Sequence, residues 1–314
     1  MIASPSRHGS TGPVLALLAN AFVWGVSWWP FRHLQALGLH PLWATTFIYV
    51  LSALAIAAWR PGALRQFATQ PALWLIFLAS GGTNACFNWA VSVGDVVRVV
   101  LLFYLMPLWA LLLARVILRE RLTRTALVRV ALAVTGAALV LWQGGSGDGG
   151  AGAVASGGAA AALPIGLALL GGFAFALNNV MLKRAAALPE EGRAIAMFLG
   201  GAVVAGSAAM ALSHQGAAGV AWPSGGAGWL LPAAGLAVAF MGSNLCLQYG
   251  AARLSAAATA VVMPCEVLFA ALTAVWWDGA VLHPTLLLGG ALILSATLAS
   301  AFEGRGTQAG ATAH

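Results

Sequence analysis

One acidic residue, Glu266, lies deep within an apolar stretch of the chain, two residues after Pro264. A carboxyl group at membrane depth is costly unless it has a partner, a proton or an aqueous cavity. Glu266 can accept a substrate ammonium group or carry a coupling proton, and a structural hydrogen bond to a neighbouring helix is the alternative. We favour a functional role and predict that Glu266 contacts substrate.

Amide side chains recur inside other apolar stretches. They sit at i and i+4, on one helix face, in two of these stretches, and are adjacent late in a third. Because an amide both donates and accepts hydrogen bonds, it suits a zwitterion with an ammonium and a carboxylate. Hydrogen bonding between helices is the alternative role. The predicted amide contacts to substrate are Asn84, Asn88, Asn178, Asn179, Asn244 and Gln248.

Three large aromatic residues extend this candidate site. Trp24 and Trp28 share one face of the first apolar stretch, beside Gly25. Together with Tyr104 and Trp109 they can line an apolar pocket for a ligand that carries a ring. Contact with lipid is the alternative. We therefore add Trp24, Trp28 and Tyr104 to the predicted substrate-binding residues.

Two prolines occupy matching positions in two apolar stretches, each directly after a methionine. Pro107 and Pro264 each lack a backbone N–H and free the carbonyl one turn earlier, at Phe103 and Ala260. We predict that both prolines kink their helices and shape or gate a central cavity. Proline is common in membrane helices, so the matching position rather than the residue type carries this prediction.

Signatures of cofactor chemistry are missing from the sequence. No G-x-x-x-x-G-K-[ST] phosphate-binding motif occurs, and the six histidines have no metal-ligand spacing. The three cysteines fall in apolar stretches and are interpreted as small apolar fillers. We expect no catalytic residue, no metal and no cofactor.

The composition restricts the chain to membranes. Of its 314 residues, 61% are apolar and 7% are charged, and the mean hydropathy is +0.89. A soluble domain carries about 25% charged residues, so the composition argues against a soluble enzyme. The 15 basic residues are scattered rather than clustered, which argues against a nucleic-acid partner. The lipid bilayer is the expected environment.

Ten apolar stretches are long enough to cross a bilayer as helices, at about 20 residues each. With the N-terminus inside, only Arg32 and Arg98 among the basic residues fall at outer ends, as the positive-inside rule requires. A cleaved signal peptide is the alternative for the first stretch. We predict an all-α integral membrane protein with both termini cytoplasmic. The predicted spans are 12–31, 40–58, 71–92, 96–118, 125–142, 163–182, 193–212, 228–250, 255–277 and 284–302.

An internal repeat divides these spans into five plus five. The pattern G-[ST]-N-x-C-x-[NQ]-[WY] occurs at 82–89 and again at 242–249, and the Met-Pro pair recurs later in each half. Because five is odd, the second copy enters the membrane from the opposite side, which is the inverted architecture of many secondary transporters. Chance similarity between helices rich in small residues is the alternative. The predicted parts are 1–142, a Gly/Ala-rich external linker at 143–162, and 163–314.

The first half carries a motif of a known family. Leu105-Met106-Pro107, Glu120 within 118–123, and Gly136 resemble the l-x-P, l-x-E-x-l-t and G signature of the EamA branch of the drug/metabolite transporter superfamily. The second half keeps Pro264 but has Asp278 within the segment 276–279, where the acidic signature is expected. The aromatic-rich, ten-helix form is similar to bacterial aromatic amino acid exporters of the YddG type.

This resemblance implies a function and a location. The expected protein is a secondary transporter of the bacterial inner membrane that exports amino acids, including Phe, Trp and Tyr, by alternating access. The family resemblance places the cavity among helices one to four and six to nine. A multidrug exporter of lipophilic cations is the alternative. A membrane enzyme would need a cluster of carboxylates or histidines at one interface, which the sequence lacks, and no obligate protein partner is evident.

Overall fold

The computed structural model describes residues 11–118, 124–142, 158–185, 187–216, 220–223, 226–254 and 262–311. Regular structure in these ranges is helical, without strands, and each predicted apolar stretch overlaps a helix. Six helical segments of the described chain are long and apolar enough to cross a membrane. They are Thr11–Ala36, Pro41–Trp59, Val96–Ile117, Ala162–Arg184, Glu190–His214 and Ala227–Leu247. The all-α membrane fold is supported, and the count of ten spans stays a prediction.

The helices of the first half are interrupted more often than the apolar pattern predicts. A short amphipathic helix after the second span was not predicted, and the fourth span is broken in two. The elements are α1 (Thr11–Val26), α2 (Trp28–Ala36), α3 (Pro41–Trp59), α4 (Gly62–Thr69), α5 (Ala72–Val93), α6 (Val96–Phe103), α7 (Met106–Leu113), the π-helical turn η1 (Ala114–Leu118) and α8 (Arg124–Trp142).

The second half contains longer helices. They are α10 (Gly158–Arg184), α11 (Glu190–His214), the 3₁₀ turn η2 (Ala227–Trp229), α12 (Leu230–Arg253), α14 (Cys265–Asp278) and α15 (Pro284–Ala311). Helix α10 begins inside the predicted linker 143–162, whose residues 143–157 lie outside the described ranges, as does the acidic motif at 119–123. Helix α14 ends at Asp278 and is capped by Gly279, where φ is +66°, a conformation that glycine adopts without steric cost.

Helix breaks occur at both Met-Pro pairs. Helix α6 ends at Phe103 and α7 begins at Met106, while α14 begins directly after Pro264. A Cβ placed at Gly172 of α10 would lie 2.8 Å from the Phe103 carbonyl oxygen, so this carbonyl packs directly against the glycine backbone. Ala260 lies outside the described residues. Helical structure is thus interrupted close to both prolines, and a kinking or gating role for Pro107 and Pro264 stays a prediction.

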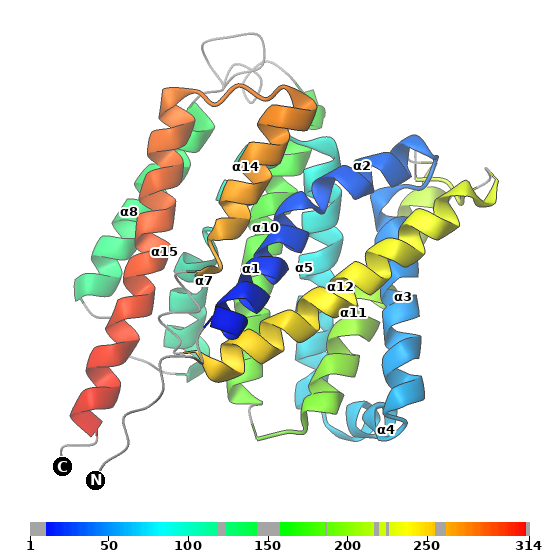
Figure 1. The fold of residues 1–314 in the computed structure, drawn as a ribbon, viewed down its shortest axis with the longest axis horizontal. Helices are drawn as coiled ribbons and strands as arrows, with labels where there is room; N and C mark the ends of the chain where they lie inside the picture. The colour runs from blue at the N-terminus through cyan, green and yellow to red at the C-terminus, as the bar shows by residue number, and fades with distance from the viewer. Residues whose placement is uncertain are drawn as a thin grey trace.

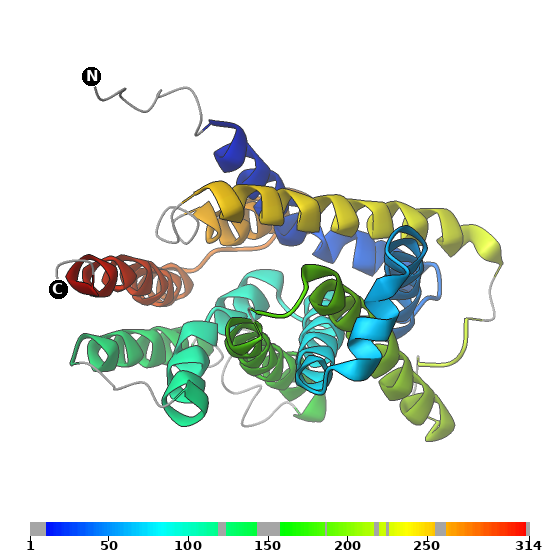
Figure 2. The ribbon, with the colours of Figure 1, turned by 90° about the horizontal axis from the view of Figure 1, so that it is seen from below.

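Helices of the two halves interleave (Figures 1 and 2). Helix α5 packs against α10 and α11, and its counterpart α12 packs against α1 and α3. In the same way α6 and α7 contact α10, and α14 contacts α1. Each of these contacts between the halves has an equivalent in which the two halves exchange places. A duplicated chain with inverted halves would pack in this way. The inverted relation itself stays a prediction.

Helices α8 and α15 lie side by side at one edge of the molecule (Figure 1). They meet at a pair of glycines: a Cβ at Gly136 would lie 2.6 Å from the Gly289 carbonyl oxygen, and a Cβ at Gly289 would lie 2.6 Å from that of Gly136. Small residues let helix backbones approach closely where no hydrophobic effect drives association between helices. The pair therefore sets the distance between these two helices.

We expect Gly136→Ala to destabilise the protein by about 1–3 kcal/mol, because the added methyl group overlaps a backbone oxygen rather than a movable side chain. Thermal unfolding in detergent measures the effect. Gly235→Ala is the matched control, since nothing lies within 4 Å of a Cβ there and alanine raises helix propensity. Equal stability of the two variants would contradict the close packing of α8 on α15.

Candidate functional site

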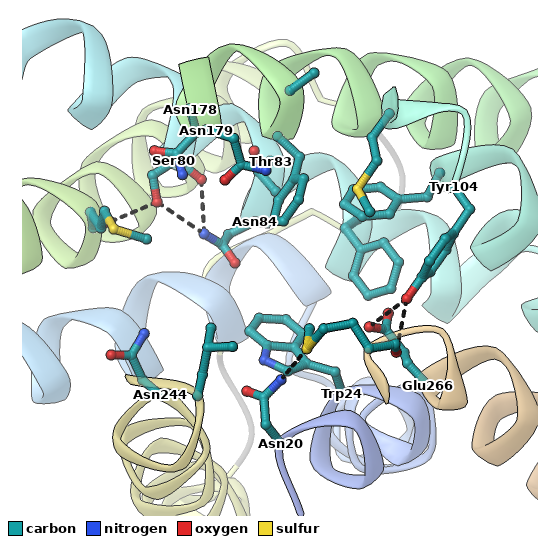
Figure 3. Close-up of a pocket in the computed structure, with 18 of the residues that line it drawn as sticks. Asn20, Trp24, Ser80, Thr83, Asn84, Tyr104, Asn178, Asn179, Asn244 and Glu266 are labelled. Carbon is teal, nitrogen blue, oxygen red and sulfur yellow. Dashed lines mark hydrogen bonds between the residues drawn. The ribbon is translucent and has the colours of Figure 1, made fainter. Parts of the chain in front are cut away.

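A cavity of about 700 Å³ lies between helices of the two halves. Most of the predicted site residues line it (Figure 3): Trp24, Asn84, Tyr104, Pro107, Asn178, Asn179, Asn244, Pro264 and Glu266. They come from α1, α5, the break after α6, the start of α7, α10, α12 and the start of α14. Tertiary structure thus brings together residues that are up to 242 positions apart, and their contact with substrate stays a prediction.

Glu266 is held in the first turn of α14 and is 8% exposed. The Tyr104 hydroxyl lies 3.3 Å from Glu266 Oε2 and 3.2 Å from the Met263 carbonyl oxygen, so it can donate to either acceptor. A carboxylate in the first turn also interacts favourably with the helix dipole. No ion pair within the described residues includes Glu266. Its carboxyl group therefore meets neutral protein partners and keeps capacity for a cationic ligand.

Asn84 is hydrogen-bonded within the protein at both ends of its amide. Its Nδ2 donates to the Ser80 carbonyl oxygen at 2.8 Å and to Ser80 Oγ at 3.3 Å, and its Oδ1 accepts from the Tyr49 hydroxyl. Ser80 Oγ in turn donates to the Met197 carbonyl oxygen at 3.2 Å. Asn84 thus joins α5 to α3, and Ser80 joins α5 to α11. Both polar atoms of the Asn84 amide are therefore already used in hydrogen bonds within the protein.

Asn178 and Asn179 lie near the end of α10 and face the same cavity. Asn178 is 3% exposed, and its Oδ1 has no hydrogen-bond partner among the described residues. Figure 3 shows both amides beside Ser80 and Asn84, while Glu266 and Tyr104 lie at the opposite side of the view. The amide region on α5 and α10 is therefore separate from the carboxyl region at the start of α14.

Asn20 of α1 is a cavity residue that sequence analysis missed. Its Oδ1 accepts from Ser243 Oγ at 2.8 Å, while its Nδ2 donates only to Met263 Sδ at 3.6 Å. Thioether sulfur is a weak acceptor, so this donor is poorly satisfied. The signal was present, because Asn20 is an amide in an apolar stretch and lies four residues before Trp24, on the same helix face.

A continuous set of aromatic rings, the aromatic belt, also lines the cavity. Trp24 stacks on Phe240 with ring centroids 4.5 Å apart, and Phe87 lies 4.7 Å from Phe103. Successive rings contact one another across seven helices from both halves. The belt consists of Phe198, Tyr49, Phe240, Trp24, Phe87, Phe103 and Phe175. Only Trp24 was predicted, since a phenylalanine facing the cavity and one facing lipid look alike in an apolar helix.

Two predicted residues lie away from the cavity, and a third cannot be placed. Trp28 is buried, and its Nε1 donates to Thr273 Oγ1 at 3.0 Å. Asn88 is also buried, and its Nδ2 donates to Thr45 Oγ1 at 3.0 Å. Both side chains thus join helices to each other. Gln248 belongs to α12, but its side chain is outside the described part of the structure.

Sequence comparison gives a family match in the first half: residues 11–142 match the EamA-like transporter family. Protein RarD of Salmonella typhi is 28% identical over 202 residues, which are 61% of this chain and 60% of RarD. The uncharacterised transporter PA0485 of Pseudomonas aeruginosa is 30% identical over 146 residues, 43% of this chain and 47% of that protein. The chain thus aligns with about 60% of RarD and less than half of PA0485.

Structural comparison covers more of the chain. One protein of known crystal structure superposes with a TM-score of 0.54 at 18% identity, over 95% of this chain and 99% of the other. At this identity the likeness concerns the fold alone. The family match and the relatives support the EamA resemblance and a membrane transporter rather than an enzyme.

Trp24 lines the cavity and Trp28 does not, so substitutions of the two residues should have different effects on transport. We expect Trp28→Phe to lower stability by about 1 kcal/mol, because it removes the hydrogen bond to Thr273, and to leave the KM for transport unchanged. Trp24→Leu removes a cavity ring and should raise KM. Both constants are measured in proteoliposomes, beside thermal unfolding in detergent. A raised KM for Trp28→Phe alone would place the site elsewhere.

Proposed function

We propose that this chain is a secondary transporter of the bacterial inner membrane that exports amino acids, aromatic ones included, by alternating access. The observation that supports this most is the composition of the cavity wall: one carboxyl group, several amides and a belt of aromatic rings, contributed by both halves. Among the described residues that line the cavity there is no Lys or Arg. Such a wall has sites for an ammonium group, for hydrogen-bonding groups and for a large apolar side chain.

The proposed binding mode follows from which polar groups of the cavity can still form a hydrogen bond or an ion pair with a ligand. Glu266 accepts the substrate ammonium, with the Tyr104 hydroxyl orienting its carboxylate. Asn20 Nδ2, which otherwise donates only to a sulfur atom, donates to the substrate carboxylate. The side chain of the substrate then enters the aromatic belt, where offset or edge-to-face ring contacts are favourable. Polar and apolar parts of one amino acid are thus bound by different helices.

Alternating access requires that contacts between the halves open and close at the two ends of the cavity. One such contact joins α2 to α14: Arg32 Nη1 donates to Asp278 Oδ2 at 2.5 Å. Arg32 Nη2 donates to the Gly94 carbonyl oxygen at 2.8 Å, and the guanidinium stacks over Trp28 at 4.9 Å. Arg32 lies at an outer end in the predicted topology, so we assign this contact to closure of the outer exit.

An exporter of lipophilic cations is the second candidate. Such a ligand suits the aromatic belt together with Glu266, which has no basic neighbour among the described lining residues. The volume of about 700 Å³ also falls in the range of about 300–1,000 Å³ that accommodates drug-sized molecules. Reconstitution separates the candidates: proteoliposomes are supplied with labelled phenylalanine and tryptophan, or with a quaternary ammonium dye. Dye flux without amino acid flux would contradict amino acid export.

Substitution of the acid tests the proposed binding mode. We expect Glu266→Gln to raise the KM for phenylalanine at least tenfold, because the amide keeps the shape of the side chain but removes the charge that pairs with the ammonium. KM is measured in proteoliposomes over a range of pH. Glu190→Gln, which makes the same change at an exposed position of α11 outside the cavity, serves as control. Unchanged kinetics and pH dependence for Glu266→Gln would limit this residue to a structural role.

The contact between α2 and α14 is tested by exchanging its charges. We expect Asp278→Arg to slow transport, because two cations then face each other where the outer exit closes. The double variant Arg32→Asp with Asp278→Arg restores the pair and should recover part of the rate. Initial rates in proteoliposomes measure both effects. A double variant as slow as the single one would show that the pair has no role in closure.

A further inference from the structure

We propose that the indole N–H of Trp24 binds the substrate carboxylate and makes the site selective for α-amino acids over amines that lack this group. The inference rests on the proposed function, in which Glu266 accepts the ammonium group, and it adds a residue that determines specificity. The substrate class is a zwitterion with its carboxylate beside its ammonium and a ring on its side chain. An aromatic amine without a carboxylate is the compound that the site discriminates against.

The indole N–H groups of the chain differ in whether they are already used. Trp28 Nε1 donates to Thr273 Oγ1 at 3.0 Å, whereas Trp24 Nε1 has no acceptor among the described residues. Trp109 Nε1 also lacks an acceptor but is covered by protein, while Trp24 Nε1 keeps accessible surface. An indole N–H donates and cannot accept, so it suits a carboxylate and not an ammonium group.

The accessible part of Trp24 faces the cavity. Its indole stacks on Phe240 of α12 at 4.5 Å and meets the edge of Phe87 of α5 at 6.3 Å. Both phenylalanines are 3% exposed, so the indole lies inside the bundle and not at its lipid-facing surface. Trp24 also belongs to the cavity wall (Figure 3). A ligand in the cavity can therefore reach this N–H.

Trp24 and Glu266 belong to the same part of the wall, because the start of α14 runs along α1. Asn20 Nδ2 donates to Met263 Sδ at 3.6 Å, and a Cβ at Gly25 would lie 2.6 Å from the Glu266 carbonyl oxygen. Trp24 lies between these two contacts on α1, and Figure 3 shows its ring on the side of Glu266, apart from the amide region. Since ammonium and carboxylate share one carbon in an α-amino acid, a ligand held by Glu266 presents its carboxylate here.

The carboxylate of such a ligand needs a donor, because a negative charge buried near Glu266 is unfavourable without one. The hydroxyl groups of Tyr49, Ser80 and Thr83 already donate within the protein. Trp24 Nε1 and the amide one turn before it, on the same face of α1, thus form a pair of donors for the two carboxylate oxygens. Hydrogen bonds to a carboxylate are charge-assisted and about twice as strong as neutral ones.

Trp24→Phe tests the N–H, because phenylalanine keeps a ring against Phe240 but has no donor. The KM for labelled phenylalanine is measured with the full-length protein in proteoliposomes, beside the inhibition constant of phenethylamine, which lacks the carboxylate. We expect KM to rise about tenfold, the effect of one charge-assisted hydrogen bond, and the inhibition constant to change by less than about twofold. A parallel rise in both constants, or no change in either, would overturn the assignment.

Two further variants serve as controls. Trp28→Phe makes the same substitution one turn later on α1, where the N–H is bonded to Thr273, and should leave both constants unchanged. Glu266→Gln should raise both constants, because both compounds carry the ammonium group. Thermal unfolding in detergent and the reconstituted amount are measured for each variant.

The unmodified protein provides a test that needs no variant. Phenethylamine should inhibit phenylalanine transport with a constant at least about tenfold above the KM for phenylalanine, since it lacks the group that Trp24 binds. Equal constants would overturn the inference. Absence of inhibition would also overturn it, because loss of the carboxylate contacts leaves those of the ammonium group and the ring in place.

The outcomes separate this inference from the proposed function. Phenylalanine flux that is independent of the Trp24 N–H would overturn the inference and leave amino acid export standing. Tighter binding of phenethylamine than of phenylalanine would overturn the role of Trp24 and favour the exporter of cations. Absence of flux for every amino acid, with dye flux retained, would overturn both proposals.

Discussion

The site depends on the carboxyl group of Glu266, because a buried acid in a membrane is costly unless other groups form hydrogen bonds or ion pairs with it. Its hydroxyl partner, Tyr104, lies at the break between α6 and α7, so that break is needed to place the phenol. Helix α1 approaches just as closely, since a Cβ at Gly25 would lie 2.6 Å from the Glu266 carbonyl oxygen. Two segments of the first half thus converge on one residue of α14, in the second half.

Glycines also bring helix backbones close together at other places in the fold. A Cβ at Gly81 would lie 2.4 Å from the Gly200 carbonyl oxygen, which joins α5 to α11, and Gly136 meets Gly289 between α8 and α15. Within a bilayer such contacts replace the hydrophobic effect as a source of helix association. Helices α8 and α15 form their contact at one edge of the molecule (Figure 1), with the cavity lined mainly by other helices. Their role is thus to support the helices that form the site.

The polar groups of the cavity divide into those that build the protein and those that remain available. Asn84, Ser80 and Tyr49 satisfy one another and hold α3, α5 and α11 together. Glu266 has only neutral partners among the described residues, and Asn20 Nδ2 donates only to a sulfur atom. Residue type alone does not separate these two groups, because asparagine belongs to both. The availability of the hydrogen-bonding atoms distinguishes a binding residue from an interhelical contact.

The sequence by itself determined the membrane class and the approximate positions of the apolar helices, and it singled out Glu266, whose role in substrate binding stays a prediction. Apolar runs and intramembrane charges are local properties, and their cost in lipid is independent of the rest of the fold. Tertiary structure decided which side chains share a cavity. It brought Asn20 and the rings of Phe87 and Phe240 to the wall and kept Trp28 and Asn88 in contacts between helices. The physical reason is that the face a helix presents to its neighbours depends on how those neighbours pack, and in a helix that is apolar on every side no periodic pattern marks that face.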